Sequence, residues 1–269
     1  MGAYSKVVSV LRQIDTAHTF IGGTRADITS AWTFVDGERR QVFPSSDFYT
    51  QVYAKTDPGS YSETLSYGRY KIVISGGGGS GGADAYGETN GVTRWANPGD
   101  SGEEITVMLD VPYGETKTIS GIIAQGGQPS KARGKQNDTS SQYATAGAGG
   151  TGYDNGKKGG AKYFPSTSGM IYVNDSFGVA GGAGGGSSSI SIDGGTVQVA
   201  KGGNGGNARI KYTNYFDYPV SGGAGGSGGT TTGTGAAGGA KGHKWDGTAT
   251  SGAGTDGYIK VYQSSIFPD

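Results

Sequence analysis

The residues best suited to chemistry in this chain are two histidines, His18 and His243, and a few serines set among glycines. Gly99-Asp100-Ser101-Gly102 has the form of a serine-protease nucleophile loop, and the run 78–82 (GGSGG) fits the nucleophile elbow of hydrolases. A serine nucleophile usually needs an imidazole base, and His18 lies in a stretch that we assign to attachment. We therefore expect no catalytic triad, and we interpret the chain as a non-enzyme.

Residues for metal and cofactor chemistry are equally scarce. The chain has no cysteine, and two histidines cannot build a standard zinc site unless carboxylates converge on them by folding. The run 252–256 (GAGTD) matches half of a calcium-binding repeat but has no second copy beside it. Glu103 and Asp110 leave glycan hydrolysis open as paired carboxylates, although no motif accompanies them. We expect no cofactor and no bound metal.

Glycine-rich motifs of the kind that bind nucleotides occur in the chain, but they lack the flanking elements that a nucleotide site requires. Gly-x-Gly-x-x-Gly begins at Gly147, Gly223, Gly233 and Gly252 among other places, but no copy lies between a strand and a helix as a dinucleotide site requires. No Gly-x-x-x-x-Gly-Lys-Ser/Thr occurs. These matches follow from composition.

That composition is the main structural signal. Of 56 glycines, six precede Ser75, and hydrophobic residues make up only 33% of the chain, too few for a conventional core throughout. Disorder is the simplest reading, yet disordered chains are typically charged and poor in aromatics, whereas this chain is 16% charged and 10% aromatic. A net charge of zero argues against nucleic acid as a partner. The first twenty residues have no apolar signal-peptide core and no stretch reaches about 18 apolar residues, so we expect neither Sec export nor a membrane span.

Short β-branched runs punctuate the glycine blocks. Residues 31–35 and 38–43 flank Asp36-Gly37, a dipeptide typical of two-residue hairpin turns. Residues 4–17 suit a helix or a strand, with a slight preference for strand. Further strands are expected at 49–54, 70–75, 105–111, 116–123, 190–192, 196–200 and 258–262, with 105–111 and 116–123 pairing around the turn at Pro112.

Within the blocks, glycines recur with a period of three, which is the period of the extended polyproline II helix. Such helices can pack closely when they lack Cβ atoms and can exchange backbone hydrogen bonds with their neighbours. We expect valine to be disruptive at Gly223 or Gly226 but tolerated at the outward positions Ala224 and Ser227. The glycines expected to form this scaffold include Gly202, Gly203, Gly205, Gly206, Gly222, Gly223, Gly225 and Gly226.

The order of these elements resembles a known family. YGRYKIVISGGGGSGG at 67–82, a strand pair with PYGE at 112–115, further glycine blocks and GYIKVY at 257–262 are similar to the glycine-rich domains of bacteriophage tail-fibre and tail-tip proteins, including the distal adhesins of T-even phages. The resemblance covers about residues 60–269 and is one of pattern. It implies a mainly β chain with little or no α-helix: an N-terminal β-rich attachment module over 1–66, and over 67–269 a strand-framed bundle of polyglycine II helices.

In that family, loops at the far end of the bundle contact a bacterial surface receptor. Here the corresponding intervals are 83–104, 128–145, 153–180, 207–220 and 243–251, of which 207–220 is the most aromatic, although its alternation equally fits a strand that caps the core. Tyr, Trp and Arg dominate binding hot spots because they bury a large area at low entropic cost. The resulting candidates for receptor binding are Tyr86, Trp95, Arg133, Tyr153, Lys157, Tyr163, Tyr212, Tyr215, Phe216 and Trp245.

The resemblance thus implies a virion protein of the tail fibre or tail tip. It would bind an outer-membrane protein or glycan of the host, and its N-terminal module would bind other tail proteins. A purely structural tail or decoration protein, an ice-binding protein and a depolymerase remain alternatives.

Overall fold

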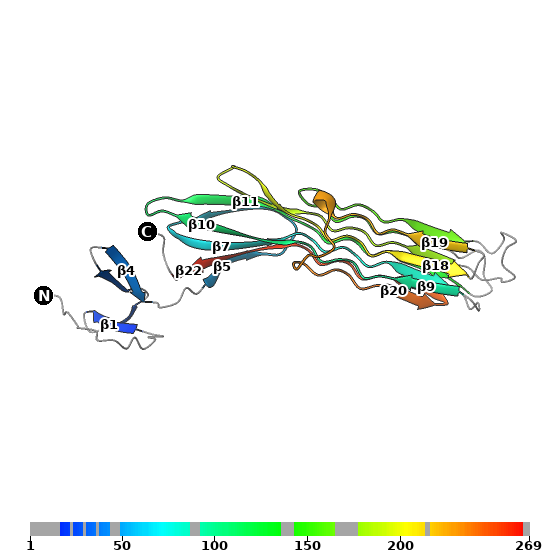
Figure 1. Ribbon diagram of the computed structural model, residues 1–269, viewed down its shortest axis with the longest axis horizontal. Coiled ribbons are helices and arrows are strands. Elements are labelled where there is room, and N and C mark those ends of the chain that lie inside the picture. Colours follow the sequence, from blue (N-terminus) through cyan, green and yellow to red (C-terminus); the bar gives the residue numbers. More distant parts are fainter. Residues whose placement is uncertain are drawn as a thin grey trace.

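The chain is almost entirely β in the computed structural model, which describes residues 17–21, 24–28, 31–35, 38–43, 49–86, 92–135, 143–164, 177–212 and 216–265. The one helical element in these ranges is a single 3₁₀ turn, η1 (Gly226–Gly228). The predicted mainly β class is therefore confirmed. Residues 49–265 form an elongated body with sheets at both ends and glycine-rich segments between them (Figure 1).

Two antiparallel pairs precede this body: β1 (Ala17–Ile21) with β2 (Thr24–Ile28), and β3 (Ala31–Val35) with β4 (Glu38–Phe43). The second pair is the hairpin predicted around Asp36-Gly37. The undecided segment 4–17 lies outside the described residues except for Ala17, the first residue of β1.

At one end of the body, the near end, two four-stranded sheets enclose the largest core. The side chains of Ile72, Ile74 and Ile259 from one sheet pack with Ile119 and Ile190 from the other, and all are fully or almost fully buried. The first sheet has the order β10 (Glu104–Val111), β7 (Gly68–Ser75), β22 (Tyr258–Ser264), β5 (Tyr49–Lys55); the second has the order β17 (Gln198–Ala200), β16 (Ser188–Ile192), β11 (Lys117–Ile123), β6 (Gly59–Leu65).

Two expectations for this end are corrected by the pairing. The runs at 105–111 and 116–123 are strands, but they do not pair with each other, because β10 joins β7 while β11 joins β6 and β16 in the opposite sheet. The boundary expected after residue 66 is also displaced, because β5 and β6 are integral strands of the glycine-rich part. Pairing partners this far apart in the sequence leave no local signal.

Glycine-rich segments connect the two ends and form a lattice of backbone hydrogen bonds. Along residues 76–82, the N–H groups of Gly76, Gly79 and Gly82 all donate to one neighbouring segment, 97–103. The N–H groups of Gly77 and Ser80 donate to 183–186, and those of Gly78 and Gly81 donate to 252–255. The direction of bonding thus repeats every three residues, as the glycine spacing predicted.

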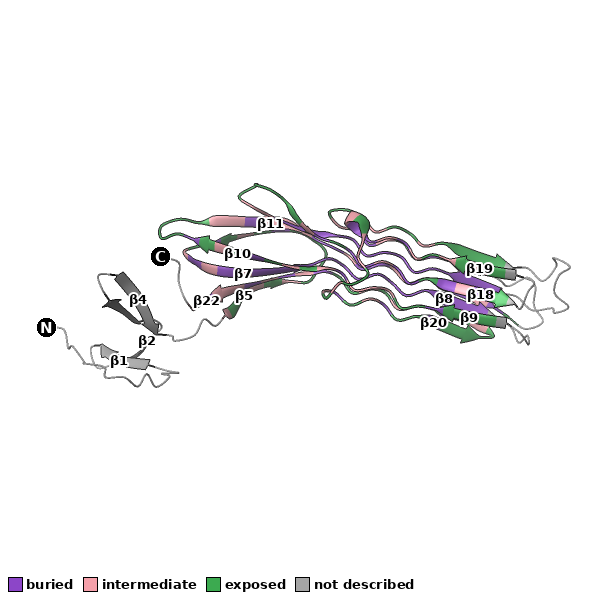
Figure 2. Cartoon of the chain, in the orientation of Figure 1, coloured by how far each residue is buried: buried purple, intermediate pink, exposed green. Residues whose placement is uncertain are grey.

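The segment 76–82 is surrounded on all sides. It donates to three segments that run antiparallel to it and accepts hydrogen bonds from three that run parallel, at Gly127, at Gly203 and Gly206, and at Gly239 and Gly242. Buried residues accordingly run through the middle of the body although it holds few side chains (Figure 2).

The lattice leaves no space for a Cβ atom at most of its glycines. At every one of the eight scaffold glycines expected from the sequence, a Cβ would lie within 3.0 Å of a backbone carbonyl oxygen of another segment. The small residues between glycines are not all outward, however: Ser80 and Ala183 are completely buried and bond to each other, Ala183 N–H donating to Ser80 Oγ over 2.7 Å. The expectation that Ser227 tolerates valine is also wrong, because the φ of 57° at Ser227 disfavours a β-branched residue.

At the opposite end, the far end, three sheets stack on one another. The middle sheet contacts one outer sheet through an aromatic and aliphatic cluster around Phe177, Val179 and Ile210, and the other through a cluster of alanines that includes Ala85 and Ala132. The middle sheet has the order β14 (Ala161–Phe164), β15 (Phe177–Ala180), β8 (Ala83–Tyr86), β20 (Gly242–Trp245); the outer sheets have the orders β19 (Phe216–Val220), β18 (Ala208–Tyr212), β9 (Val92–Ala96) and β13 (Tyr143–Thr145), β12 (Lys131–Gly134), β21 (Gly247–Thr250).

Two adjacent glycines give a direct test of the lattice. A Cβ on Gly159 would meet Gly181 and Gly182 backbone atoms within 3.0 Å, whereas a Cβ on Gly160 would meet nothing closer than 3.6 Å. We expect Gly159→Ala to lower the free energy of unfolding by about 1–3 kcal/mol, the usual cost of overpacking. Gly160→Ala should change it by less than about 0.5 kcal/mol. Urea unfolding of both variants measures this, and equal effects would contradict a lattice held by backbone contact.

Candidate functional site

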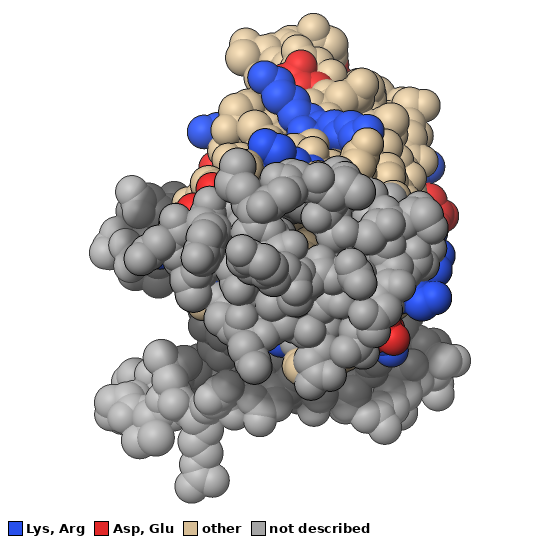
Figure 3. Space-filling model, turned by 90° about the vertical axis from the view of Figure 1, so that its right-hand side faces the viewer, with Lys and Arg blue, Asp and Glu red and all other residues tan. Residues whose placement is uncertain are grey.

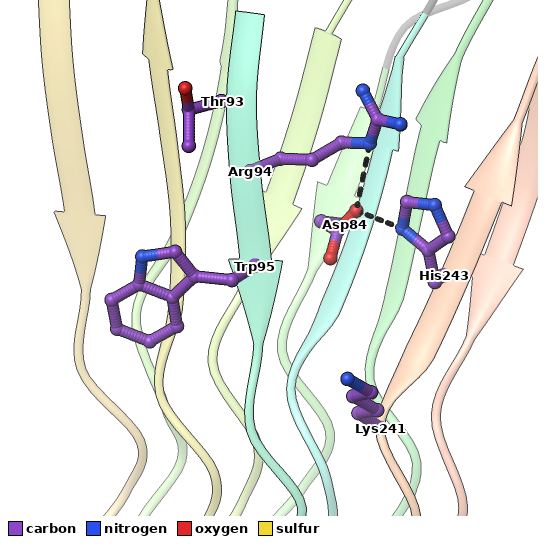
Figure 4. A pocket seen from close by; sticks show the side chains of 6 residues that line it. All are labelled: Asp84, Thr93, Arg94, Trp95, Lys241 and His243. Carbon is purple, nitrogen blue, oxygen red and sulfur yellow. Dashed lines mark hydrogen bonds and ion pairs between the residues drawn. The ribbon is translucent and has the colours of Figure 1, made fainter.

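An open cleft of about 420 Å³ lies at one margin of the far end, between the edge strands of two stacked sheets. Strand β9 provides Thr93, Arg94 and Trp95 to its lining, and the start of β20 provides Lys241 and His243 (Figure 4). Asp84, from the neighbouring strand β8, closes its floor.

Asp84 is the electrostatic centre of this cleft. Its side chain is only 2% exposed, and its Oδ1 lies 2.5 Å from Nδ1 of His243 and 4.0 Å from Nε of Arg94. The parallel pairing of β20 with β8 places His243 directly beside Asp84 in register, so both side chains lie on the same face of the sheet. A buried carboxylate is costly unless it is paired, and the side chains of His243 and Arg94 provide that pairing.

Burial and pairing act on Asp84 in opposite directions. Removal from water raises the pKa of the Asp84 carboxyl above its ordinary value, while the hydrogen bond from His243 and the charges of His243, Arg94 and Lys241 lower it. Burial is the larger effect, so the net pKa is raised. The folded protein therefore retains a proton on Asp84 to a higher pH than the unfolded chain does.

Hydrolytic chemistry is not assembled here. An Asp–His pair orients the base in serine hydrolases, but the hydroxyl residue that lines the cleft, Thr93, lies on the opposite side of β9 from the pair (Figure 4). Among the residues that the structure describes, no group of three or more His, Cys, Asp or Glu side chains is placed to hold a metal ion.

Cation–π contacts connect the two stacked sheets at both margins of the far end. Arg94 lies over Trp245 with 5.7 Å to the ring centroid, and at the opposite margin Lys162 of β14 lies over Tyr218 of β19 at 4.3 Å. Trp95 and Trp245 retain exposed fractions of 38% and 49%, and the ring of Trp95 extends from the side of β9 that faces away from Asp84 and His243 (Figure 4). Viewed end-on, further Lys and Arg side chains gather on the side of the body above the grey residues (Figure 3).

The structure brings some of the receptor-binding candidates together and separates others. Trp95 and Trp245 both lie at the far end beside Arg94, and Tyr163 lies on β14 at the opposite margin, 54% exposed. Arg133 is on β12, where its Nε is buried without a hydrogen-bond partner among the described residues. The backbone of Tyr86, Tyr212 and Phe216 lies at the ends of β8, β18 and β19, and Tyr215 lies outside the described residues.

Tyr153 and Lys157 are placed elsewhere. The N–H of Tyr153 donates to Ser187 O and that of Lys157 to Ala224 O, so both residues lie along the side of the glycine lattice and not at the far-end strands. Each of the five intervals expected as loops also contains all or part of two strands of the far end. Asn207–Val220 is the clearest case: β18 pairs with β19, and Ile210 is fully buried in the core.

Asp84 and Lys241 were missed by reasoning from the sequence, and His243 was considered only as a base or metal ligand, without its partner. Asp84 and His243 are 159 positions apart, and only the parallel pairing of β8 with β20 reveals them as neighbours. A lone His two residues before a Trp in a glycine-rich chain gives no sign of this partner.

Comparison with known proteins identifies no relatives: no protein-family model matches the chain, and no curated protein matches it. Within the described ranges, no helix has the length and apolar character needed to cross a membrane.

The raised pKa of Asp84 gives a pH dependence of known sign. Between the ordinary value of 3.8 and the raised value, the folded state binds the proton and the unfolded state does not, so this group's contribution to stability falls as the pH rises. We expect the melting temperature of the wild type minus that of Asp84→Asn to decrease as the pH rises above 3.8.

Asp110→Asn is a control of opposite sign. The hydrogen bond from Arg69 lowers the pKa of Asp110, so its contribution is present above 3.8 and is lost as the pH falls. Thermal scans across the same range measure both variants. If the melting temperature of the wild type minus that of Asp84→Asn instead increased with pH, the ion pairs would affect the pKa of Asp84 more than burial does.

Proposed function

We propose that this chain is the receptor-binding adhesin of a bacteriophage tail fibre or tail tip. The observation that carries the proposal is the separation of the molecule into a backbone lattice and a far end to which the chain returns five times, between β8 and β9, β12 and β13, β14 and β15, β18 and β19, and β20 and β21. A rigid scaffold that presents many chain reversals on one surface is suited to recognition, because binding residues can vary there without disturbing the core.

The chemistry of the far end supports binding. Trp95 and Arg94 line one cleft, and Arg94 lies over the ring of Trp245. Side chains of these types combine a large contact area with a polar or charged group. A bacterial outer-membrane protein or surface glycan is the partner that we propose for this end.

The near end is the proposed attachment side. Large apolar side chains are exposed there, including Tyr113 at 87%, Met108 at 55% and Val52 at 49%, and the N-terminal residues lead directly into β5. Exposed apolar groups of this kind commonly mark protein interfaces. We propose that this end and the N-terminal residues bind other tail proteins, which would place the protein in the virion.

Binding of fluorescently labelled full-length protein to a panel of bacterial strains tests the proposal. We expect saturable binding to cells of at least one strain, with an affinity reduced at least about fivefold in Trp95→Ala, since an aromatic anchor is worth more than about 1 kcal/mol. Tyr113→Ser, at the near end, is the matched control and should bind cells as the wild type does.

Two outcomes would count against the adhesin. Absence of binding to every strain, with both variants folded, would remove its main support. Antibodies against the far end that fail to label intact virions while those against the near end succeed would favour a purely structural tail or decoration protein.

A further inference from the structure

The outer sheet of the far end that is formed by β13, β12 and β21 has two different faces. On its inner face, Ala132 and Ala249 are buried in the alanine cluster against the middle sheet. Because side chains alternate along a strand, Lys131 and Arg133 lie on the opposite, outward face of β12. The outward side chains of these three strands are termed the β12 face.

The strand register arranges the β12 face in two rows of three side chains. The first row is Tyr143, Arg133 and Thr248, and the second row is Thr145, Lys131 and Thr250. All six side chains are wholly or partly exposed. Strands β12, β13 and β21 contain no Asp or Glu, so the charged groups that they contribute to this face are the two cations.

The outward face of the opposite sheet, formed by β19, β18 and β9, also holds cations, but their charge is compensated. Arg209 donates two hydrogen bonds to the carboxylate of Asp217, and Lys211 lies directly opposite Asp217 in register. On the β12 face, by contrast, Nε of Arg133 has no hydrogen-bond partner among the described residues. A cation without a bonded carboxylate remains available to an anion from outside the chain.

Arg133 is also held in place before any ligand binds. The hydroxyl of Tyr143 lies 3.2 Å from Oγ1 of Thr248, so the Tyr143 side chain reaches from β13 to β21 and crosses β12 at the position of Arg133. A side chain that is already ordered loses less entropy when it binds. The β12 face therefore combines positive charge, hydroxyl groups and a constrained guanidinium.

We propose that the β12 face binds a phosphate monoester carried by a sugar, with the phosphate between Lys131 and Arg133. Alternate residues of a strand lie about 7 Å apart, a separation that two long cationic side chains can span to reach one phosphate. A phosphate monoester carries about −1.5 to −2 charges at pH 7 and has three acceptor oxygens, which match two cations and nearby hydroxyls better than a carboxylate does. The inference rests on the proposed function and specifies its surface glycan as a phosphorylated one.

Isothermal titration calorimetry of the full chain with glucose 6-phosphate, glucuronate and glucose tests the proposal. We expect glucose 6-phosphate to bind at least about fivefold more tightly than glucose, the ratio that corresponds to about 1 kcal/mol from exposed ion pairs. Glucuronate should bind less tightly than glucose 6-phosphate because it carries a single charge. Raising the salt from about 0.05 M to about 0.5 M should weaken the binding of glucose 6-phosphate, because salt screens exposed charges.

Matched variants locate the binding. Lys131→Gln should lower the affinity for glucose 6-phosphate about threefold to fivefold, and Arg133→Gln at least about fivefold, because a guanidinium can donate two hydrogen bonds to one phosphate. Lys211→Gln removes the same charge from the outward face of the opposite sheet, beside Asp217, and should leave the affinity unchanged. Circular dichroism and a thermal scan of each variant show whether it is folded, and Lys131, which is exposed, keeps the test valid if Arg133→Gln is unstable.

Several results would overturn the inference. Glucose 6-phosphate that binds no more tightly than glucose, or does not bind, would remove the role of phosphate, and tighter binding of glucuronate would replace phosphate with carboxylate. Equal losses in Lys131→Gln and Lys211→Gln would show general attraction to basic surfaces.

The failure of this inference is distinguishable from the failure of the adhesin. Binding to cells that depends on Trp95 but is unchanged in Lys131→Gln and Arg133→Gln would sink the phosphate site and leave the adhesin intact. Conversely, binding of glucose 6-phosphate that depends on Lys131, with no binding to any strain, would support the site and count against the adhesin.

Discussion

The structure depends on the direct approach of one backbone to another. In the middle of the body, the Cα of a glycine faces a carbonyl oxygen of a neighbouring segment, and at most positions a Cβ would lie within 3.0 Å of that neighbour. Buried N–H groups there find a carbonyl or side-chain oxygen as acceptor in another segment, which is the condition for burying a peptide group without a large penalty. Ordering so many glycines costs more entropy than ordering other residues, and the dense hydrogen bonding offsets that cost without side-chain burial.

This lattice ends where side chains become available, and buried serines mark the change. Ser75 Oγ accepts a hydrogen bond from Ala236 N–H, Ser188 Oγ donates to Ser75 O, and Ser130 Oγ accepts from Gly147 N–H. Each of these serines lies at or beside the first or last residue of a strand, where the bonding period changes from three to two. Backbone groups there cannot follow either pattern completely, so a small hydroxyl completes the hydrogen bonding that the backbone leaves open.

Local signals in the sequence were sufficient to predict the strands and turns but not to predict which strands pair. The β-branched runs at 70–75 and 258–262 and the Asp36-Gly37 turn predicted strands that the structure contains, and the glycine spacing predicted a threefold bonding period. Pairing could not be predicted, because β6 joins β11 and β8 joins β20 over long separations that no periodicity records. For the same reason, Trp95 and Trp245 were recognised as binding candidates from residue type alone. The pair of Asp84 and His243 was not recognised, because it depends on the pairing of β8 with β20.

The geometry of the candidate cleft follows from the lattice more than from the far-end sheets. Strands β9 and β20 belong to different sheets and share no ladder, so local pairing does not set the distance between them. The segments that lead to these strands are nevertheless adjacent in the lattice, where Gly99 N–H donates to Gly239 O over 2.9 Å and Gly102 N–H donates to Ala236 O over 2.8 Å. A further bond joins each segment to Gly79, which donates to Asp100 O and accepts from Gly239 N–H. Since backbone contacts in the lattice fix the spacing of the two segments, side chains such as Trp95 and Lys241 can differ between related chains while that spacing is preserved.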